Sequence, residues 1–158
     1  MIRTAKSKWF GSLRNGRGFI VSESGELSAL SYSYKERFED AVGINPEEMV
    51  AAAHSSCLSM GIAAELDKRG IEPQSIDVIS AISFENISNV WSIPEVHLKV
   101  VINALGANPR LVEEAANIAK INCPISRLLR TSITMELFIH TKPSHLEKTD
   151  IESLHDQQ

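Results

Sequence analysis

One long apolar segment most constrains how this chain can fold. Residues 45–69 have the pattern of a single helix, with Asn45 as a favourable N-cap, Pro46 at the first helical position and Gly70 as a C-terminal stop. Over residues 50–66 nearly every face of this helix is apolar or small, and such a helix is buried on all sides. Because a chain of 158 residues has little core to offer, we expect an obligate homodimer whose two long helices pack together.

Hairpins and further helices flank this segment. Asn-Gly at residues 15–16 is a strong hairpin signal, and residues 32–38 are expected to be a short extended segment or a loop. Predicted strands cover residues 6–13, 17–22, 75–86, 92–104 and 131–141. Asn108-Pro109 opens a helix to about residue 121, and Cys123-Pro124 opens a short one to about residue 130. This order predicts an α+β fold with antiparallel sheets and the helices on one face.

Domain organisation and composition narrow the class of protein. We expect one domain over residues 1–141 and a polar, frayed tail over residues 142–158. The net charge of −4, without a dense basic stripe, argues against a nucleic-acid partner. No run of about 18 consecutive apolar residues predicts a membrane span, and residues 1–6 lack the apolar core of a signal peptide. A cytoplasmic protein without a membrane partner is therefore expected.

Two cysteines, Cys57 and Cys123, stand far apart in this sequence. In the cytoplasm they are expected to be reduced at rest, so a transient catalytic or sensing disulfide is more plausible than a structural one. The alternative of two inert buried thiols stays open, because free cysteine is among the most buried residue types.

The sequence around each cysteine predicts a different tendency of its thiol to ionise. Burial in the middle of a helix raises the pKa of Cys57, so that thiol is inert unless a cation lies against it, either His54 or an arginine from elsewhere. Cys123 is the expected N-cap of the short helix, where the helix dipole and backbone N–H groups favour a thiolate. On these grounds alone, Cys123 ionises more easily.

Three motifs carry a resemblance to a known family. These are Asn-Pro-Glu-Glu at residues 45–48, Ala-Ala-Ala-His-Ser-Ser-Cys ending at Cys57, and Cys-Pro-Ile-Ser starting at Cys123. In this order and phase they resemble the OsmC/Ohr family, which comprises osmotically inducible protein C and the organic hydroperoxide resistance proteins. The resemblance covers residues 6–141. The arginine just before the Asn-Pro motif and the histidine at His54 are more similar to the OsmC branch.

The resemblance implies a cysteine-based peroxidase that reduces organic hydroperoxides and, less efficiently, hydrogen peroxide. It matches Cys57 to the peroxidatic cysteine and Cys123 to the resolving cysteine. Arg37 matches the arginine that contacts the reactive thiolate, and Glu47 matches the acid that holds this arginine. A sulfenic acid on Cys57 would condense with Cys123 to a disulfide, which a dithiol reductant reopens. In Ohr-type relatives that reductant is a lipoylated protein. No cofactor is implied, and no metal, flavin or haem motif is visible.

Spacing adds one hypothesis about the dimer. Glu47 precedes Cys57 by ten residues, which is about 15 Å along a helix. One arginine would be stretched to reach both within a chain. If the long helices pair antiparallel, an active site at the subunit interface receives Arg37 and Glu47 from the partner chain.

Three rival functions could use the same residues. A redox sensor or structural stress protein would use the same cysteines without turnover, although no output module is visible. A cysteine hydrolase using Cys57 and His54 lacks a third orienting group and free N–H groups for an oxyanion hole. A zinc site of Cys57, Cys123 and His54 lacks the paired spacing of zinc ligands.

The remaining residues near the motifs have simpler interpretations. His54 is expected to be a buried, hydrogen-bonded core residue, and Glu48 to serve the helix cap. Ser126 and Arg127 are expected to serve only the short helix. Five side chains are candidates for lining an apolar pocket for an alkyl hydroperoxide: Phe38, Met60, Ile62, Trp91 and Leu128.

Overall fold

The computed structural model of the chain describes residues 1–39 and 41–143. The chain divides into two compact units, Met1–Val50 and Ala51–Gln158, and the division falls inside the long helix α2, Pro46–Asp67. One domain over residues 1–141 stays a prediction. The predicted polar tail lies outside the described residues from residue 144 onward.

The first unit holds a three-stranded antiparallel sheet of order β1-β2-β3 and one short helix. The predicted hairpin is confirmed, but Phe10 pairs with Arg17, so the connection covers residues 11–16 and is wider than an Asn-Gly turn. Gly11, at φ +83°, begins that connection. Residues 34–38 form a helix, where an extended segment or a loop was predicted. The elements are β1 Ala5–Phe10, β2 Arg17–Ser22, β3 Leu30–Ser33 and α1 Tyr34–Phe38.

The ends of α2 follow the sequence signals closely. The Asn45 side chain accepts a hydrogen bond from the Glu48 N–H at 2.8 Å, which is the predicted N-cap. At the other end Gly70 has a φ of +66°, and the Ile71 N–H reaches back to the Leu66 carbonyl at 3.1 Å. These bonds satisfy terminal backbone groups that have no partner inside the helix.

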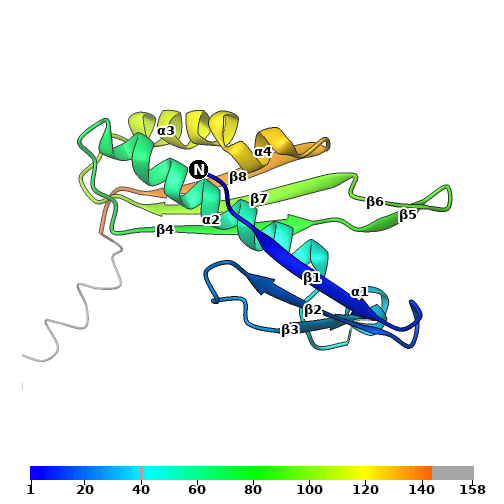
Figure 1. Cartoon of the computed structure of the whole chain (residues 1–158). Helices are drawn as coiled ribbons and strands as arrows, with labels where there is room; N and C mark the ends of the chain where they lie inside the picture. The colour runs from blue at the N-terminus through cyan, green and yellow to red at the C-terminus, as the bar shows by residue number, and fades with distance from the viewer. Residues whose placement is uncertain (40, 144–158) are drawn as a thin grey trace, which may run out of the picture. The chain divides into compact units, whose positions relative to one another are not determined.

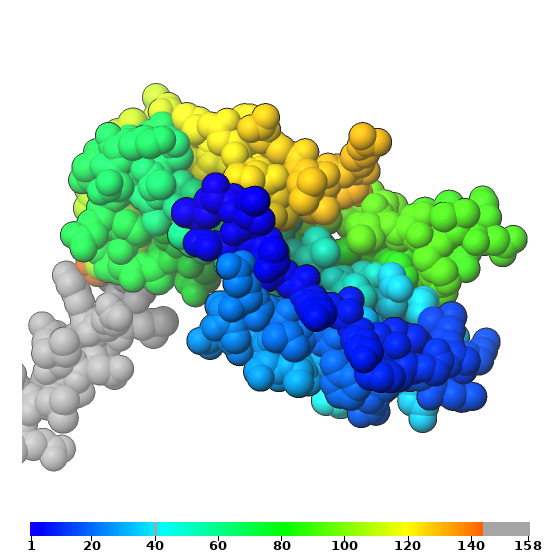
Figure 2. All heavy atoms as spheres, in the orientation of Figure 1, coloured from blue at the N-terminus to red at the C-terminus, as the bar shows by residue number. Residues whose placement is uncertain are grey.

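The second unit is built on a three-stranded sheet of order β4-β7-β8 (Figure 1). A small hairpin of β5 and β6, turning at Ser88 and Asn89, interrupts the long strand pair predicted between residues 75 and 104. It extends beyond the end of the β4–β7 pair, as Figure 2 also shows. The strands are β4 Ser75–Ile82, β5 Glu85–Ile87, β6 Val90–Ser92, β7 Glu95–Asn103 and β8 Ser132–His140.

One strand pair in this sheet is parallel. β4 and β7 are antiparallel as predicted, but β7 and β8 run in the same direction. Parallel neighbours need a crossover connection, and α3 (Pro109–Asn122) followed by α4 (Pro124–Leu128) supplies it. The Asn108 side chain caps α3 by accepting from the Arg110 N–H at 3.0 Å, as the Asn-Pro signal predicted.

The core of the second unit lies between the sheet and the helices α2 and α3. Every second residue of β7 is fully buried on the inner face, and four residues of α2 spaced by one turn pack into the same cluster or beside it. The α2 residues are His54, Leu58, Ile62 and Leu66; the β7 residues are Val96, Leu98, Val100 and Ile102. The helices of this unit therefore pack against one face of the sheet, as predicted.

Only this one stripe of α2 is buried within a single chain. The other faces carry exposed small or apolar side chains, among them Ala52, Ala53, Met60 and Ala63. Within the described residues α2 alone meets the length and hydropathy of a membrane span, with a mean hydropathy of 1.2. The sequence still holds no run of about 18 consecutive apolar residues, since serines and a histidine interrupt α2, and it passes only because the test averages over the helix. A core helix passes the same test.

The burial pattern predicts a contrast between two isoleucines on helices. Ile62 is fully buried and Ile121 is 70% exposed. Ile62→Ala should lower the free energy of unfolding by about 2–5 kcal/mol, because it leaves a cavity in the core. The matched control Ile121→Ala should change it by no more than about 0.5 kcal/mol. Denaturant unfolding at one fixed protein concentration measures both, and equal losses would contradict the assignment of the core.

Candidate active site

The structure brings the two cysteines together. Cys57 lies in the middle of α2, and Cys123 lies at the junction where α3 ends and α4 begins. The two sulfur atoms are 3.4 Å apart, and both thiols are free. A disulfide needs a sulfur–sulfur bond of about 2.05 Å, so a small movement suffices to close one. Cys123 is buried and Cys57 is half-buried.

The surroundings move the two thiol pKa values in opposite directions. Burial, followed by the contact with Cys123, raises the pKa of Cys57. Burial would raise the pKa of Cys123 too, but the N–H and hydroxyl of Ser126, then Cys57 and the Ile125 N–H, outweigh it and lower that pKa. The surroundings of Cys123 therefore favour its ionised form, whereas those of Cys57 oppose it.

His54 lies one turn before Cys57 on α2, but its ring does not serve that sulfur. Its Nε2 atom is 2.8 Å from the hydroxyl oxygen of Ser126 on α4. The side chain is fully buried, and this burial lowers the pKa of the imidazole below its usual value. His54 is thus a neutral, hydrogen-bonded core residue as predicted, and it is not the cation that would ionise Cys57.

A second group of charged residues lies in the first unit. The Arg37 guanidinium, on α1, donates three hydrogen bonds of 2.7 to 3.3 Å to the Glu47 carboxylate at the start of α2. Such fork-shaped pairing fixes the plane of the guanidinium as well as its position. Glu47 is largely buried, with 13% of its side chain exposed, whereas Arg37 keeps 37%. Arg37 is therefore the more exposed member of the pair.

Local bonds hold α1 against the first turn of α2. The Ser33 hydroxyl caps α1 by accepting from the Lys35 N–H at 3.2 Å, and it also bonds the Glu36 carboxylate. That bond, the largest cause, lowers the pKa of Glu36. The Asn45 side chain, which caps α2 through its oxygen, donates from its nitrogen to the Glu36 carbonyl at 3.5 Å. One asparagine thus links the helix that carries Arg37 to the helix that carries Glu47.

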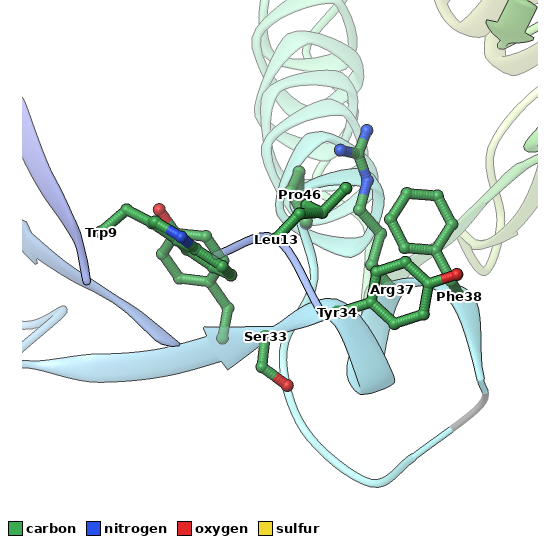
Figure 3. Close-up of a pocket in the computed structure, with 8 residues that line it drawn as sticks. Trp9, Leu13, Ser33, Tyr34, Arg37, Phe38 and Pro46 are labelled. Carbon is green, nitrogen blue, oxygen red and sulfur yellow. The ribbon is translucent and has the colours of Figure 1, made fainter. Parts of the chain in front are cut away.

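Beside Arg37 lies an aromatic cleft of about 370 Å³. Figure 3 shows the rings of Tyr34 and Phe38 next to the arginine side chain. On the sheet side, Trp9, Gly18 and Tyr32 form one row across the three strands. Gly18 has no side chain there, and a Cβ would collide with the Tyr32 ring. The cleft is lined by Trp9, Leu13, Tyr32, Ser33, Tyr34, Arg37, Phe38 and Pro46.

The five residues predicted to line a pocket lie in different parts of the structure. Of the five candidates, only Phe38 lines this cleft. Ile62 is core, while Met60 and Leu128 are each 73% exposed and Trp91 is 50% exposed. Trp91 stacks on Phe84 beside the β5–β6 hairpin, with ring centroids 4.7 Å apart. Sequence reasoning identified apolar residue types, but it missed the cleft residues Trp9, Tyr32 and Tyr34, which strand pairing brings together.

Two further sequence predictions concern rival chemistry and Ser126. His54 faces Ser126, so the Cys57–His54 pair that a hydrolase would need is not formed. In residues 1–39 and 41–143, no three His, Cys, Asp or Glu side chains gather closely enough to hold a metal ion. Ser126 does more than serve its short helix, since its hydroxyl oxygen lies 2.8 Å from His54 Nε2.

A fold of this kind around two facing thiols defines a small α+β dithiol protein. Residues 38–138 match the family model described as OsmC-like protein, and the chain belongs to this family. Peroxiredoxin OsmC of Escherichia coli is 31% identical over 134 residues, covering 85% of this chain and 94% of that protein.

Solved structures agree on the fold. An OsmC-like protein of unknown function from Vibrio cholerae superposes with a TM-score of 0.72 at 18% identity, over 87% of this chain and 99% of the other. The organic hydroperoxide resistance protein OhrB of Bacillus subtilis gives a TM-score of 0.62 at 21% identity, over 86% and 97% of the two chains.

The buried imidazole predicts a pH dependence of stability. The unfolded chain takes up a proton on His54 near pH 6.5, whereas the folded chain, with its lowered pKa, takes it up only at lower pH. The free energy of unfolding should therefore fall as the pH drops from about 7 to 5, by up to about 1.4 kcal/mol per unit from this group. His54→Gln should flatten that slope in denaturant titrations. Parallel wild-type and variant curves would contradict the assignment.

Proposed function

We propose that the protein is a thiol-dependent peroxidase that reduces organic hydroperoxides, and hydrogen peroxide less efficiently. The observation that carries the proposal is the pair of free sulfurs 3.4 Å apart in a member of the OsmC-like family. The name of the 31% identical relative, peroxiredoxin OsmC, supports peroxide chemistry. We place the reaction in the cytoplasm, where both thiols are reduced at rest.

In the proposed cycle, the Cys57 thiolate attacks the distal peroxide oxygen and releases an alcohol, or water from hydrogen peroxide. The sulfur is left as a sulfenic acid. Cys123 then displaces the hydroxyl from that sulfur and forms the Cys57–Cys123 disulfide. A dithiol reductant, such as a lipoylated protein, restores both thiols by exchange. The chemistry needs no bound cofactor.

Cys57 needs a cation for this role, because its own surroundings raise its pKa. Arg37 is our candidate, held in place by Glu47 through the fork of hydrogen bonds. A positive charge against the sulfur would lower the pKa of Cys57 and orient the peroxide. The aromatic cleft beside Arg37 would hold the apolar part of an alkyl or aryl hydroperoxide, which favours organic substrates over hydrogen peroxide.

We further propose a homodimer in which Arg37 and Glu47 act on Cys57 of the partner chain. Ten residues of sequence separate Glu47 from Cys57, which is about 15 Å of helix, more than one arginine spans while it keeps its carboxylate. The exposed small and apolar residues of α2 are the surface on which two copies would pack.

Peroxide consumption tests the assignment of the cysteines. With a dithiol reductant, the wild type should consume cumene hydroperoxide faster than hydrogen peroxide. Cys57→Ser should abolish turnover, because it removes the atom that is oxidised. Cys123→Ser should allow a single oxidation and then stop. Ser59→Ala, which removes a hydroxyl that donates to the Ser56 carbonyl of its own helix, is the matched control. An inactive wild type that still forms the disulfide slowly in air would replace the peroxidase with a redox sensor.

Mixing two inactive variants tests the shared site. Cys57→Ser and Arg37→Ala homodimers should each have little activity. When subunits exchange, each mixed dimer regains one intact site, because one chain supplies Cys57 and the other supplies Arg37. An equal mixture should recover about a quarter of the wild-type rate, given random pairing of two subunits. If Arg37 acts within its own chain, mixing will restore nothing.

A further inference from the structure

Gly18 is the one glycine that lies inside a strand among the residues that the structure describes. It occupies β2, the middle strand of the first sheet, and it is buried. Glycine weakens a strand, because it has no side chain to pack and loses more conformational freedom on folding than any other residue. The backbone does not require it here, since Gly18 lacks the positive φ that Gly11 and Gly25 have. The remaining reason for a glycine is space.

The ring of Tyr32 fills the space above Gly18. The two residues are paired across β2 and β3, and a Cβ on residue 18 would collide with Cε1, Cζ and Oη of the ring. These atoms are the outer end of the tyrosine side chain, so the ring lies across β2 toward β1. There it meets Trp9, with ring centroids 5.6 Å apart and ring planes tilted by 46°. The two rings thus span the three strands.

Trp9 is held in place at the other end of this pair. Its indole Nε1 donates to the Gly11 carbonyl at 3.0 Å. A Cβ on Gly16 would stand 2.8 Å from the same nitrogen, but it would also collide with two backbone carbonyls, so the chain itself requires that glycine. At Gly18 the three nearest atoms all belong to the Tyr32 side chain. An added methyl group therefore displaces one ring and leaves the strands in place.

We propose that Gly18 is a positioning residue that sets the substrate preference of the aromatic cleft. Because Gly18 has no side chain, the Tyr32 ring stays against Trp9, and the two rings form one continuous wall for the apolar part of a hydroperoxide. In Figure 3, Trp9 lies on the side of the cleft opposite Phe38 and Arg37. Gly18 itself does not line the cleft and acts only through Tyr32. This proposal rests on the proposed function, in which the cleft takes the organic part of the substrate.

The wall distinguishes peroxides by the apolar surface that they present to it. Trp9 and Tyr32 are half-buried, so a bound apolar group covers ring surface that the chain leaves open. Cumene hydroperoxide offers a phenyl ring and two methyl groups, tert-butyl hydroperoxide offers three methyl groups, and hydrogen peroxide offers none. The contribution of the wall to binding should therefore decrease in this order.

Steady-state kinetics test this preference. Gly18→Ala should lower the ratio of kcat/KM for cumene hydroperoxide to kcat/KM for hydrogen peroxide by about tenfold. The loss should fall mainly on KM, because the wall contacts the part of the substrate that does not react. The ratio for tert-butyl hydroperoxide should fall less. Gly61→Ala, whose Cβ would meet only the Ala119 methyl group at 3.6 Å, is the matched control and should keep the ratio.

A double-mutant cycle separates displacement of the ring from a general weakening of β2. Tyr32→Leu, which lacks the colliding atoms, should lower the ratio about as much as Gly18→Ala, because each change removes the wall. Adding Gly18→Ala to Tyr32→Leu should then have no further effect, since the methyl group no longer meets a ring. Equal losses from Gly18→Ala in the two backgrounds would overturn the proposal.

A proton chemical shift reports the position of the ring without any turnover. One Hα of Gly18 points in the direction of the absent Cβ and therefore at the Tyr32 ring. The ring current should move the shift of this hydrogen away from the usual glycine range, and Tyr32→Leu should return it. A shift that is the same in the two proteins would show that the ring does not lie over Gly18, and the proposal would fail.

Binding of 2-phenylpropan-2-ol, the alcohol that cumene hydroperoxide yields, separates the wall from the catalytic cycle. In a Trp91→Phe protein, Trp9 is the single tryptophan, and its fluorescence reports binding. Gly18→Ala should weaken the binding of the alcohol by about tenfold. If the protein consumes no peroxide but this difference is found, the proposed function fails and the wall stands. If peroxide is consumed and Gly18→Ala binds the alcohol as well as its parent does, the wall fails and the proposed function stands.

Discussion

The arrangement of the thiols depends on one stripe of α2. His54, Leu58, Ile62 and Leu66 recur every fourth residue, and all four are fully buried. Residues at this spacing share one helix face, so their burial fixes the rotation of α2 about its axis. Cys57 immediately precedes Leu58, at the edge of the stripe, where its sulfur meets Cys123. A different rotation would carry Cys57 away from its partner and break the contact between His54 and Ser126.

Burial and hydrogen bonding have opposite effects on the pKa values of the two thiols, and a different effect dominates at each cysteine. For Cys57 burial prevails, and its pKa rises; for Cys123 the donors around Ser126 prevail, and its pKa falls. The second unit by itself therefore favours a thiolate on Cys123 over one on Cys57. This is the physical reason why the proposed function needs the Arg37–Glu47 pair, whose charge would reverse the order at the moment of attack.

The residues of the first unit show how a charged group and an apolar cleft can be built by short-range structure. Asn45 ties α1 to the start of α2, which places Arg37 against Glu47. The bare position at Gly18 lets Tyr32 lie beside Trp9, with ring centroids 5.6 Å apart. Charge and aromatic surface thus meet at one place, which suits a substrate with a polar reacting end and an apolar body.

The sequence by itself determined the elements whose signals are local. Caps, Asn-Pro starts, the Gly70 stop and strand alternation predicted α2, α3, α4 and most strands, because these depend on neighbours a few residues away. The motifs also pointed to the family and to Cys57, Cys123, Arg37 and Glu47. Only the tertiary structure decided the parallel pairing of β7 and β8, the row of Trp9, Gly18 and Tyr32, and the contact from His54 to Ser126. Those joined residues are up to 72 positions apart, and their meeting depends on how strands and helices pack, which no local pattern encodes.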